Sequence, residues 1–350
     1  MERLLILEDG SIYRGKALGS NHFQVGELVF HTGMTGYQEV LTDNTNCGEI
    51  VVMTYPLIGN CGINRDDYKG MDPSVFGIVM KDYCEVPSNF RCDETLDEFL
   101  KREEIPAIYD VDTRAITRKL RDNGTMKAIF ADANANIEEV VALLHMAKEL
   151  HNQVDMVASH EIYTIPNKGK RIVLIDCGSK LDVSRELSER GCEVIVVPYD
   201  TSVEKILSFR PDGVVVTEGP GNPEDLPGVI KTIKTLIPQT VVFGIGLGHE
   251  LIALACGAKT YKLKFGHHGG NNPVVELDTG KVQIVTQNHG YAVDIDSLKD
   301  TRLEMNYRAL NDRSCEGIRH KDYPCFSVQF HPATGKVFDQ LMEAMDKEEK

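Results

Sequence analysis

The sequence lacks three features, and each absence excludes a class of protein. No apolar run approaches the roughly 20 residues that cross a bilayer. Basic residues are outnumbered, with 38 Lys and Arg against 53 Asp and Glu, whereas nucleic-acid binding depends on basic side chains at phosphates. The first residues, Met1–Gly10, carry acids where a signal peptide would be apolar. We therefore expect a soluble cytoplasmic protein whose partners include neither a membrane nor nucleic acid.

The cysteines also lack the spacing of a metal or disulfide framework. The chain has nine of them, an odd number, and no two form a C-x-x-C pair. Zinc ribbons and disulfide scaffolds both rely on paired, regularly spaced cysteines. We expect reduced thiols, as in a cytosolic protein.

What the sequence does contain is enough apolar material for two domains. With 350 residues, 42% of them apolar and 26% charged, the composition is that of a globular protein. Residues 1–150 show short alternating runs and glycine turns, which predicts an N-terminal mixed β/α domain. The polar stretch 151–170 contains Pro166 and Gly169 and is predicted to be a linker. Residues 171–350 form the second predicted domain.

Within the first domain, alternation of apolar side chains predicts strands at Gly26–His31 and Glu49–Tyr55. Helical spacing predicts helices at Thr95–Arg102, Asp112–Asn123 and 137–150.

The second domain alternates apolar strands with helices, which predicts an α/β fold with a doubly wound, mostly parallel sheet. The predicted strands are Arg171–Asp176, Glu193–Pro198, Gly213–Thr217 and Thr240–Ile245. In such sheets the ligand crevice lies at the carboxyl ends of the strands. Three loops are expected to meet there: Asp176–Lys180, Glu218–Asn222 and Gly246–His249.

The loop at Gly246 lies in the segment Phe243–Glu250, with the sequence F-G-I-G-L-G-H-E. A strand that enters a helix through such a turn can expose one strained side chain as a nucleophile elbow. The helix N-terminus then directs backbone N–H groups at the same spot. A plain tight turn remains an alternative. A dinucleotide fingerprint fits poorly, because the glycine spacing differs and Phe265–Gly270 stands where an acid is required.

Long motifs on both sides of this segment resemble a known family. The second domain is similar to class I glutamine amidotransferases at Gly244–Gly248, Lys264–Pro273, Gln287–Val293 and Gln329–Pro332. Together with the first domain, the chain resembles the small subunits of carbamoyl-phosphate synthetases. The first-domain motifs are Leu7–Gly10, Gly26–Phe30, Met34–Asp43, Thr54–Asn60 and Asp110–Arg114.

The resemblance implies a catalytic triad of which this chain keeps one member. In the family a cysteine at the elbow attacks the glutamine amide, a histidine acts as its base, and a glutamate two residues further orients the imidazole. Here the elbow position is Gly246, the base is His331, and the orienting position is Ala333. We therefore expect no glutamine hydrolysis by the family's route.

The substrate-binding positions implied by the resemblance are partly retained. Those retained are Gly219, Gly221, Leu247, Asn288, Gly290 and Tyr291. Three positions differ: Glu250 replaces the family's glutamine, Glu218 replaces its asparagine, and Thr45 lies in an altered substrate loop. If Glu218 and Glu250 both face His331, they should raise the pKa of the histidine.

Other groups offer weaker chemistry. Cys256 lies about 15 Å along the helix from the elbow, whereas Cys177 and Cys47 are near the crevice and are most simply explained as packed thiols. His267, His268 and His289 belong to motifs of the family, so we expect no metal with His331.

The sequence therefore predicts a small subunit that docks onto a large subunit through its N-terminal domain. In the family the large subunit uses ATP and Mg to make carbamoyl phosphate for pyrimidine and arginine synthesis, and we expect no cofactor in this chain. With the glutaminase inactive, the complex would take free ammonia. Two alternatives remain: a non-catalytic binding module for glutamine or another amino acid, and a glutaminase with a displaced nucleophile.

Overall fold

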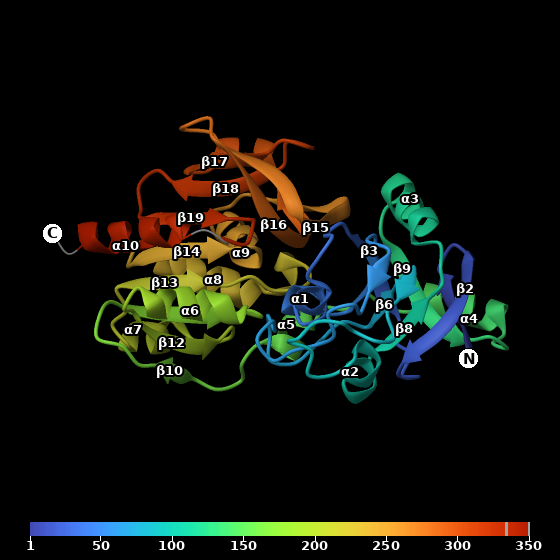
Figure 1. The fold of residues 1–350 in the computed structure, drawn as a ribbon. Helices are drawn as coiled ribbons and strands as arrows, with labels where there is room; N and C mark the ends of the chain where they lie inside the picture. Colours follow the sequence, from blue (N-terminus) through green and yellow to red (C-terminus); the bar gives the residue numbers. More distant parts are fainter. Residues whose placement is uncertain (333–334, 349–350) are drawn as a thin grey trace. The chain divides into compact units, whose positions relative to one another are not determined.

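The computed structural model describes residues 1–332 and 335–348. The chain divides into two compact units, Met1–Leu150 with Lys264–His268, and His151–Leu263 with Gly269–Lys350 (Figure 1). Within the described ranges, every helix is too short or too polar to traverse a bilayer.

The first unit is built on a closed β-barrel with mixed strand directions. Around the barrel the strands follow the order β1 (Glu2–Leu7), β2 (Ile12–Gly19), β8 (Pro106–Tyr109), β6 (Gly77–Val79), β4 (Glu49–Met53), β3 (Gly26–His31) and β9 (Met126–Asp132). The predicted strands at Gly26–His31 and near Glu49 are both present, but local alternation could not show that the sheet closes.

Strand β1 explains how the barrel is covered. Leu5 and Leu7 pack with barrel residues such as Leu28, whereas Leu4 and Ile6 pack with Leu144. These four residues are all fully buried. Because side chains alternate across a strand, β1 is apolar on both faces, with helix α4 (Ile137–Met146) packed against one of them.

Helices α2 and α3 of this unit each begin at a residue whose side chain caps them. Helix α2 (Leu96–Arg102) starts with a capping box between Thr95 and Glu98. The Asp112 side chain caps α3 (Thr113–Asn123), which ends at Gly124, as predicted. Helix α4 ends at Met146, four residues earlier than predicted, because residues 147–150, half-buried at Ala147 and exposed after it, bring no further fully buried apolar side chain to it. Short elements complete the unit: α1 (Tyr37–Leu41), η1 (Asn44–Asn46), β5 (Leu57–Ile58) and β7 (Asp82–Tyr83).

The side chain of Arg3 holds neighbouring barrel strands together. Its guanidinium Nη1 donates to the carbonyl oxygens of Leu18 at 2.8 Å and Ala107 at 2.7 Å, and Nη2 donates to Ser20 at 2.8 Å. Arg3 is 2% exposed, and this burial lowers the pKa of its guanidinium. A buried cation is tolerated here because its N–H groups are matched by backbone carbonyls.

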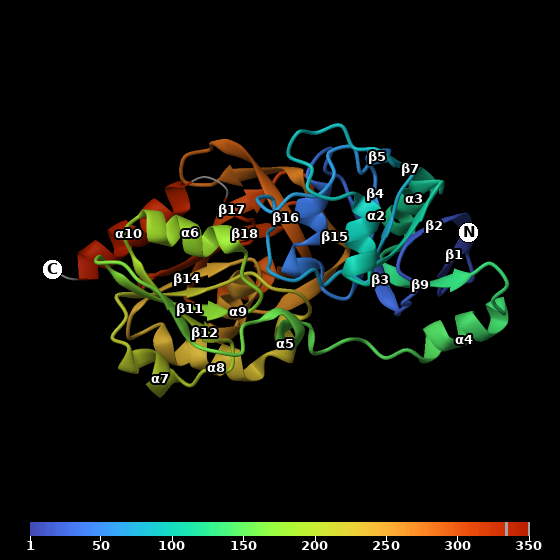
Figure 2. The same cartoon turned by 60° about the horizontal axis from the view of Figure 1, so that its bottom comes forward.

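The second unit contains a ten-stranded sheet within its described residues, with helices on both faces (Figures 1 and 2). Five neighbouring strands are parallel, in the order β12 (Glu193–Pro198), β11 (Arg171–Asp176), β13 (Gly213–Val216), β14 (Val241–Ile245) and β19 (Cys325–Val328). One face carries α7 (Val203–Ser208), α8 (Pro227–Leu236) and α9 (Leu247–Ala255), and the other carries α6 (Leu181–Glu189) and α10 (Lys336–Glu348). The doubly wound core is therefore as predicted.

The prediction of a mostly parallel sheet is wrong for the sheet as a whole. Beyond β19 the sheet continues with β18 (Cys315–His320), β16 (Val282–Val293), β15 (Thr260–Glu276) and β17 (Leu303–Ala309), and these strands pair antiparallel. Long strands joined by short turns do not need the helical crossover that parallel neighbours require.

The stretch 151–170, predicted as a linker, contains regular structure. Helix α5 (Gln153–Val157) packs Val154 into the core of the second unit. Strand β10 (Tyr163–Ile165) pairs antiparallel with β12 at the edge of the sheet. Its polar composition reflects this edge position, where β10 is largely exposed.

We expect Arg3→Met to lower the free energy of unfolding by about 3 kcal/mol, because it leaves buried carbonyl groups without donors. Urea unfolding monitored by circular dichroism measures the change. Arg14→Met is the matched control, because Arg14 is an exposed arginine on the neighbouring strand β2. Equal stabilities for the two variants would contradict the role assigned to Arg3.

Candidate functional site

The loops after β11, β13 and β14 meet at the carboxyl edge of the parallel strands, as predicted. The Cys177 N–H donates to Thr217 Oγ1 at 2.9 Å, and the Gly248 N–H donates to the Thr217 carbonyl at 3.1 Å. The Gly246 N–H donates to the Val328 carbonyl at 2.9 Å. These bonds fix the three loops and the end of β19 against one another.

Gly246 forms a sharp turn between β14 and α9, with φ 55° and ψ −114°. Residues other than glycine rarely adopt this backbone conformation. It is the strained geometry expected of a nucleophile elbow. The turn is therefore an elbow in its backbone, yet the residue at its apex has no side chain.

Glu218 occupies the space beside this apex. A Cβ added to Gly246 would lie 2.9 Å from Glu218 Cβ, which is closer than real Cβ atoms approach. The Glu218 side chain is 5% exposed, and its Oε1 lies 3.6 Å from His331 Nδ1. The same oxygen accepts a hydrogen bond from the Lys180 N–H at 3.2 Å. A side chain at the elbow would therefore require residue 218 to shift slightly, and it would face the Glu218 carboxylate beside His331.

The second partner of His331 is Asp182, which the sequence did not predict. His331 Nε2 lies 3.0 Å from Asp182 Oδ2, at the start of α6. Burial and the Lys180 ammonium lower the pKa of His331, but the Asp182 and Glu218 carboxylates outweigh them, so the pKa is raised above its usual value. The only sequence signal for Asp182 was its place at the start of a helix that follows a parallel strand.

Glu250 points to a different neighbour from the one expected. Its carboxyl is fully buried and accepts a hydrogen bond from Gln329 Nε2 at 3.0 Å. Burial raises the pKa of Glu250 to about 8; the Gln329 hydrogen bond opposes the rise and Glu316 adds to it. At neutral pH this side chain is mostly an uncharged acid packed between α9 and β19.

The remaining predicted residues fall in three places. Gly219, Gly221 and Leu247 lie in the loops at the sheet edge, where a Cβ on Gly219 would clash with the Cys177 carbonyl at 2.2 Å. Asn288, Gly290 and Tyr291 lie on β16, which reaches His331 through a 2.9 Å bond from the His331 N–H to the Thr286 carbonyl. Thr45 lies in the first unit, where its hydroxyl donates to Asp43 at 2.7 Å. Ala333 lies outside the described residues.

The thiols considered as substitute nucleophiles are poorly suited to the task. Cys177 is fully buried, and burial, Asp176 and Glu218 all raise its pKa. Burial raises the pKa of Cys256 to about 11, and that of Cys47, in the first unit, to about 12. A neutral buried thiol is a weak nucleophile.

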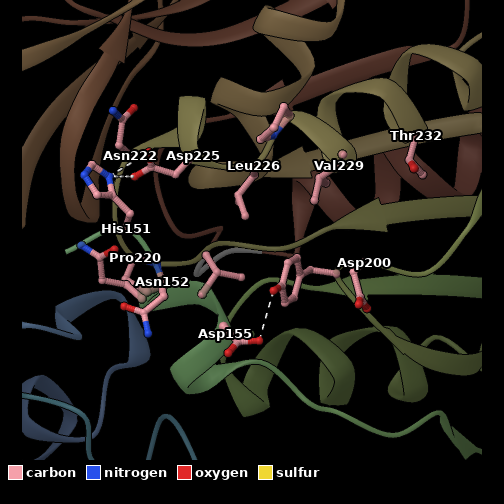
Figure 3. A pocket seen from close by; sticks show the side chains of 15 residues that line it. His151, Asn152, Asp155, Asp200, Pro220, Asn222, Asp225, Leu226, Val229 and Thr232 are labelled. Atoms are coloured by element: carbon pink, nitrogen blue, oxygen red, sulfur yellow. Dashed lines mark hydrogen bonds and ion pairs between the residues drawn. The ribbon is translucent and has the colours of Figure 1, made fainter.

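A separate cavity of about 560 Å³ opens beside α5 and the start of α8 (Figure 3). Its wall includes the His151–Asp225 pair at 3.0 Å and the Tyr199 hydroxyl, which donates to Asp155 at 3.1 Å. The lining contains Pro220 and Asn222, so the cavity shares a loop with the elbow site, but its described lining residues exclude His331, Glu218 and Gly246.

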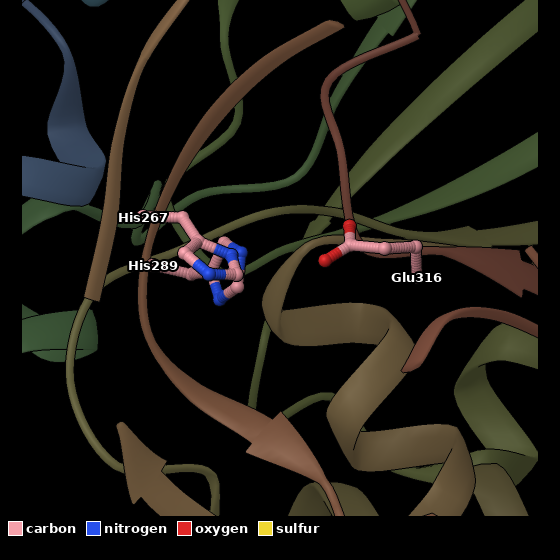
Figure 4. A group of neighbouring side chains, drawn as sticks. All are labelled: His267, His289 and Glu316. Atoms are coloured by element: carbon pink, nitrogen blue, oxygen red, sulfur yellow. The ribbon is translucent and has the colours of Figure 1, made fainter. Parts of the chain in front are cut away.

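Figure 4 shows His289 and Glu316 of the second unit. His289 Nδ1 lies 2.7 Å from the Tyr291 carbonyl, and Glu316 accepts hydrogen bonds from Gln287 and from the Ser314 hydroxyl. His267, also labelled there, belongs with Lys264–His268 to the first unit. The interactions of His289 and Glu316 within the second unit are those of packed structural residues.

We expect Glu250→Gln to stabilise the chain increasingly as pH rises. Glu250 stays protonated in the folded chain up to about pH 8 but ionises near 4.5 when unfolded, so its contribution is fully present below pH 4.5 and is lost as pH rises toward 8. Glutamine is uncharged at every pH. The gain in unfolding free energy should exceed about 1 kcal/mol at pH 8 and shrink toward pH 5.

Urea unfolding at several pH values measures this gain, and the exposed residue Glu224 supplies the control Glu224→Gln. A gain from Glu250→Gln that stays constant between pH 5 and 8 would contradict the assignment.

Two family models and several sequence relatives match this chain, and together they cover most of its length. Residues 5–130 match the family model of the carbamoyl-phosphate synthase small chain, CPSase domain, and residues 173–341 match that of class I glutamine amidotransferases. The chain is 54% identical to the carbamoyl phosphate synthase small chain of Fusobacterium nucleatum, covering 99% of each chain. It is 51% identical to that of Oceanobacillus iheyensis, over 97% of this chain and 95% of that protein.

A third relative, the pyrimidine-specific small chain of Bacillus subtilis, is 48% identical over 100% of this chain and 98% of its own length. Similarity at this level over the full length of both chains shows common ancestry and a common fold. The chain belongs to the carbamoyl-phosphate synthase small-chain family.

Proposed function

We propose that this chain is a carbamoyl-phosphate synthase small subunit that supports an ammonia-using large subunit and does not hydrolyse glutamine through an elbow thiol. The observation that carries the proposal is the elbow itself. Its backbone has the strained turn of a nucleophile site, but the residue at the apex is Gly246. Without a side chain there, no covalent thioester can form by the family's route.

The surroundings of Gly246 support loss of the nucleophile rather than its displacement. Glu218 fills the neighbouring space, and its carboxylate lies beside His331. A negative charge at that point disfavours a thiolate in the same place. The buried thiol of Cys177 has a pKa raised by burial, so it offers no ready substitute.

The proposal keeps the docking role for the first unit. By resemblance, this domain contacts the large subunit, which would use ATP, bicarbonate and ammonia to make carbamoyl phosphate. The name of the Bacillus subtilis relative assigns that protein to pyrimidine synthesis, and we propose pyrimidine or arginine synthesis as the setting here.

The reconstituted complex with its large subunit should make carbamoyl phosphate from ammonium salts, but from glutamine only at background. Removing a catalytic nucleophile costs about 10⁶-fold in turnover. A coupled assay of carbamoyl phosphate measures both rates, and the ammonium rate is the control for a competent large subunit. A glutamine-dependent rate above about 1 per second, in the usual range of enzymes, would refute the proposal.

The alternative of an amino-acid binding module has its own support, since Asn288 and Tyr291 lie on β16, which forms a bridge to His331 at Thr286. Calorimetric titration of the same complex with glutamine separates the two. Saturable binding without ammonia release would favour the binding module; no binding would favour an abandoned pocket.

Restoring catalysis should require several changes together. Gly246→Cys alone should give no measurable hydrolysis, because the new Cβ meets Glu218 at 2.9 Å and must adopt a strained backbone. The combination of Gly246→Cys with Glu218→Asn, Glu250→Gln and Ala333→Glu removes both carboxyl groups from the pocket and supplies a thiol and a carboxylate on either side of His331. We expect it to be alkylated by a glutamine-like electrophile at least about tenfold faster than the single variant.

Mass spectrometry of the labelled elbow peptide measures this difference. The same four changes with Gly246→Ser in place of Gly246→Cys provide the control for labelling elsewhere. A folded combined variant that labels no faster than Gly246→Cys alone would show that the pocket has been rebuilt for another purpose.

A further inference from the structure

His331 lies between two carboxylates that come from different strand ends. Asp182 belongs to the first turn of α6, after β11, and Glu218 follows β13. One ligand atom from each of the three side chains can be chosen so that all lie within 4.8 Å of one another. The three residues therefore form a compact group at the carboxyl edge of the parallel strands.

One carboxylate oxygen in this group lacks a hydrogen bond. Glu218 is 4% exposed, and its Oε2 is buried without a donor, although Oε1 of the same carboxylate has the Lys180 N–H at 3.2 Å. Leaving a charged buried oxygen unmatched is costly. The carboxylate that bears it faces His331, so a cation held in this group would satisfy it.

An imidazole and two carboxylates are suitable donors for a divalent transition metal of the zinc type. Zinc binds histidine nitrogen and carboxylate oxygen at about 2.0–2.2 Å, which places neighbouring ligand atoms about 3.3 Å apart. The present separations are 3.0 Å for His331 to Asp182 and 3.6 Å for His331 to Glu218. These two distances end on different ring nitrogens, and a metal binds only one of them, so one carboxylate must rotate toward the nitrogen that the other faces before all three side chains can hold one ion.

The charged group that opposes a metal here is Lys180. It is 5% exposed, and its ammonium lowers the pKa of His331, so it lies close enough to repel a second cation. Its presence predicts modest affinity. It also supplies a test. If the group binds a metal, removing the Lys180 charge should increase the affinity for that metal. If the group is only an ion-pair cluster, the same change should produce no metal binding.

We infer that His331, Glu218 and Asp182 form a binding site for a zinc-like divalent cation in place of the family's catalytic centre. The cation would bridge the ends of β11, β13 and β19 and stabilise the site without chemistry. Of the three residues, Asp182 had no role predicted from the sequence. The inference rests on the proposed function, because a cation on His331 would occupy the residue that acts as the base in glutamine hydrolysis; the metal titration below is read independently of any glutaminase assay.

The experiment titrates the full chain, freed of metal with EDTA, with Zn²⁺ and with Co²⁺. We expect one ion per chain at this site and a rise in melting temperature with ion concentration. Co²⁺ bound by nitrogen and oxygen gives weak visible absorption, whereas thiolate ligation adds a strong ultraviolet charge-transfer band, so the spectrum identifies binding at the cysteines.

The variants Glu218→Gln and Asp182→Asn should each weaken binding at least about tenfold. Lys180→Met should tighten it, and Glu224→Gln, an exposed carboxylate nearby, should leave it unchanged. Asp182 is the more exposed of the two ligands, at 28%, so its variant remains informative if Glu218→Gln does not fold. Circular dichroism checks each fold.

Three results would overturn the inference: no saturable uptake by the wild-type chain, uptake unaffected by both carboxylate variants, or a spectrum dominated by thiolate. Any of these would leave the group as a buried ion-pair cluster that is balanced by Lys180 and the imidazolium.

Discussion

The backbone turn at Gly246 is the constraint on which the candidate site depends. It closes β14 against β19 through the bond from its N–H to the Val328 carbonyl, and it starts α9, whose Gly248 N–H is bonded to the Thr217 carbonyl at the end of β13. A turn with φ 55° and ψ −114° is unfavourable for residues with a Cβ. In a glycine it carries little strain, so Gly246 holds this turn at low cost.

The charges around His331 differ from those that a reactive thiol requires. A thiol site requires a neutral or positive neighbourhood that stabilises thiolate. Here Glu218 and Asp182 flank His331 instead, and both carboxylates favour the imidazolium. Breaking a buried ion pair is strongly destabilising, even where forming one contributes little.

Glu250 illustrates a different outcome for a charged residue at a pocket position. It is fully buried beside Gln329, and burial keeps it protonated near neutral pH. A protonated carboxyl can mimic a carboxamide, since it has one donor and one acceptor oxygen. Glu250 therefore introduces no buried charge near neutral pH, at the expense of a pH-dependent stability.

The sequence by itself determined the family and the doubly wound core, because these depend on local motifs and on the apolar pattern of single strands and helices. Helices α2 and α3 began and ended at their capping residues for the same reason. Only the tertiary structure decided that the first sheet closes into a barrel, that the second continues antiparallel beyond β19, and that residues 151–170 pack on the second unit. It also placed Asp182 against His331, 149 residues away along the chain. Strand order and such pairings arise from long-range packing, and periodicity within one segment carries no record of the partner that the segment will meet.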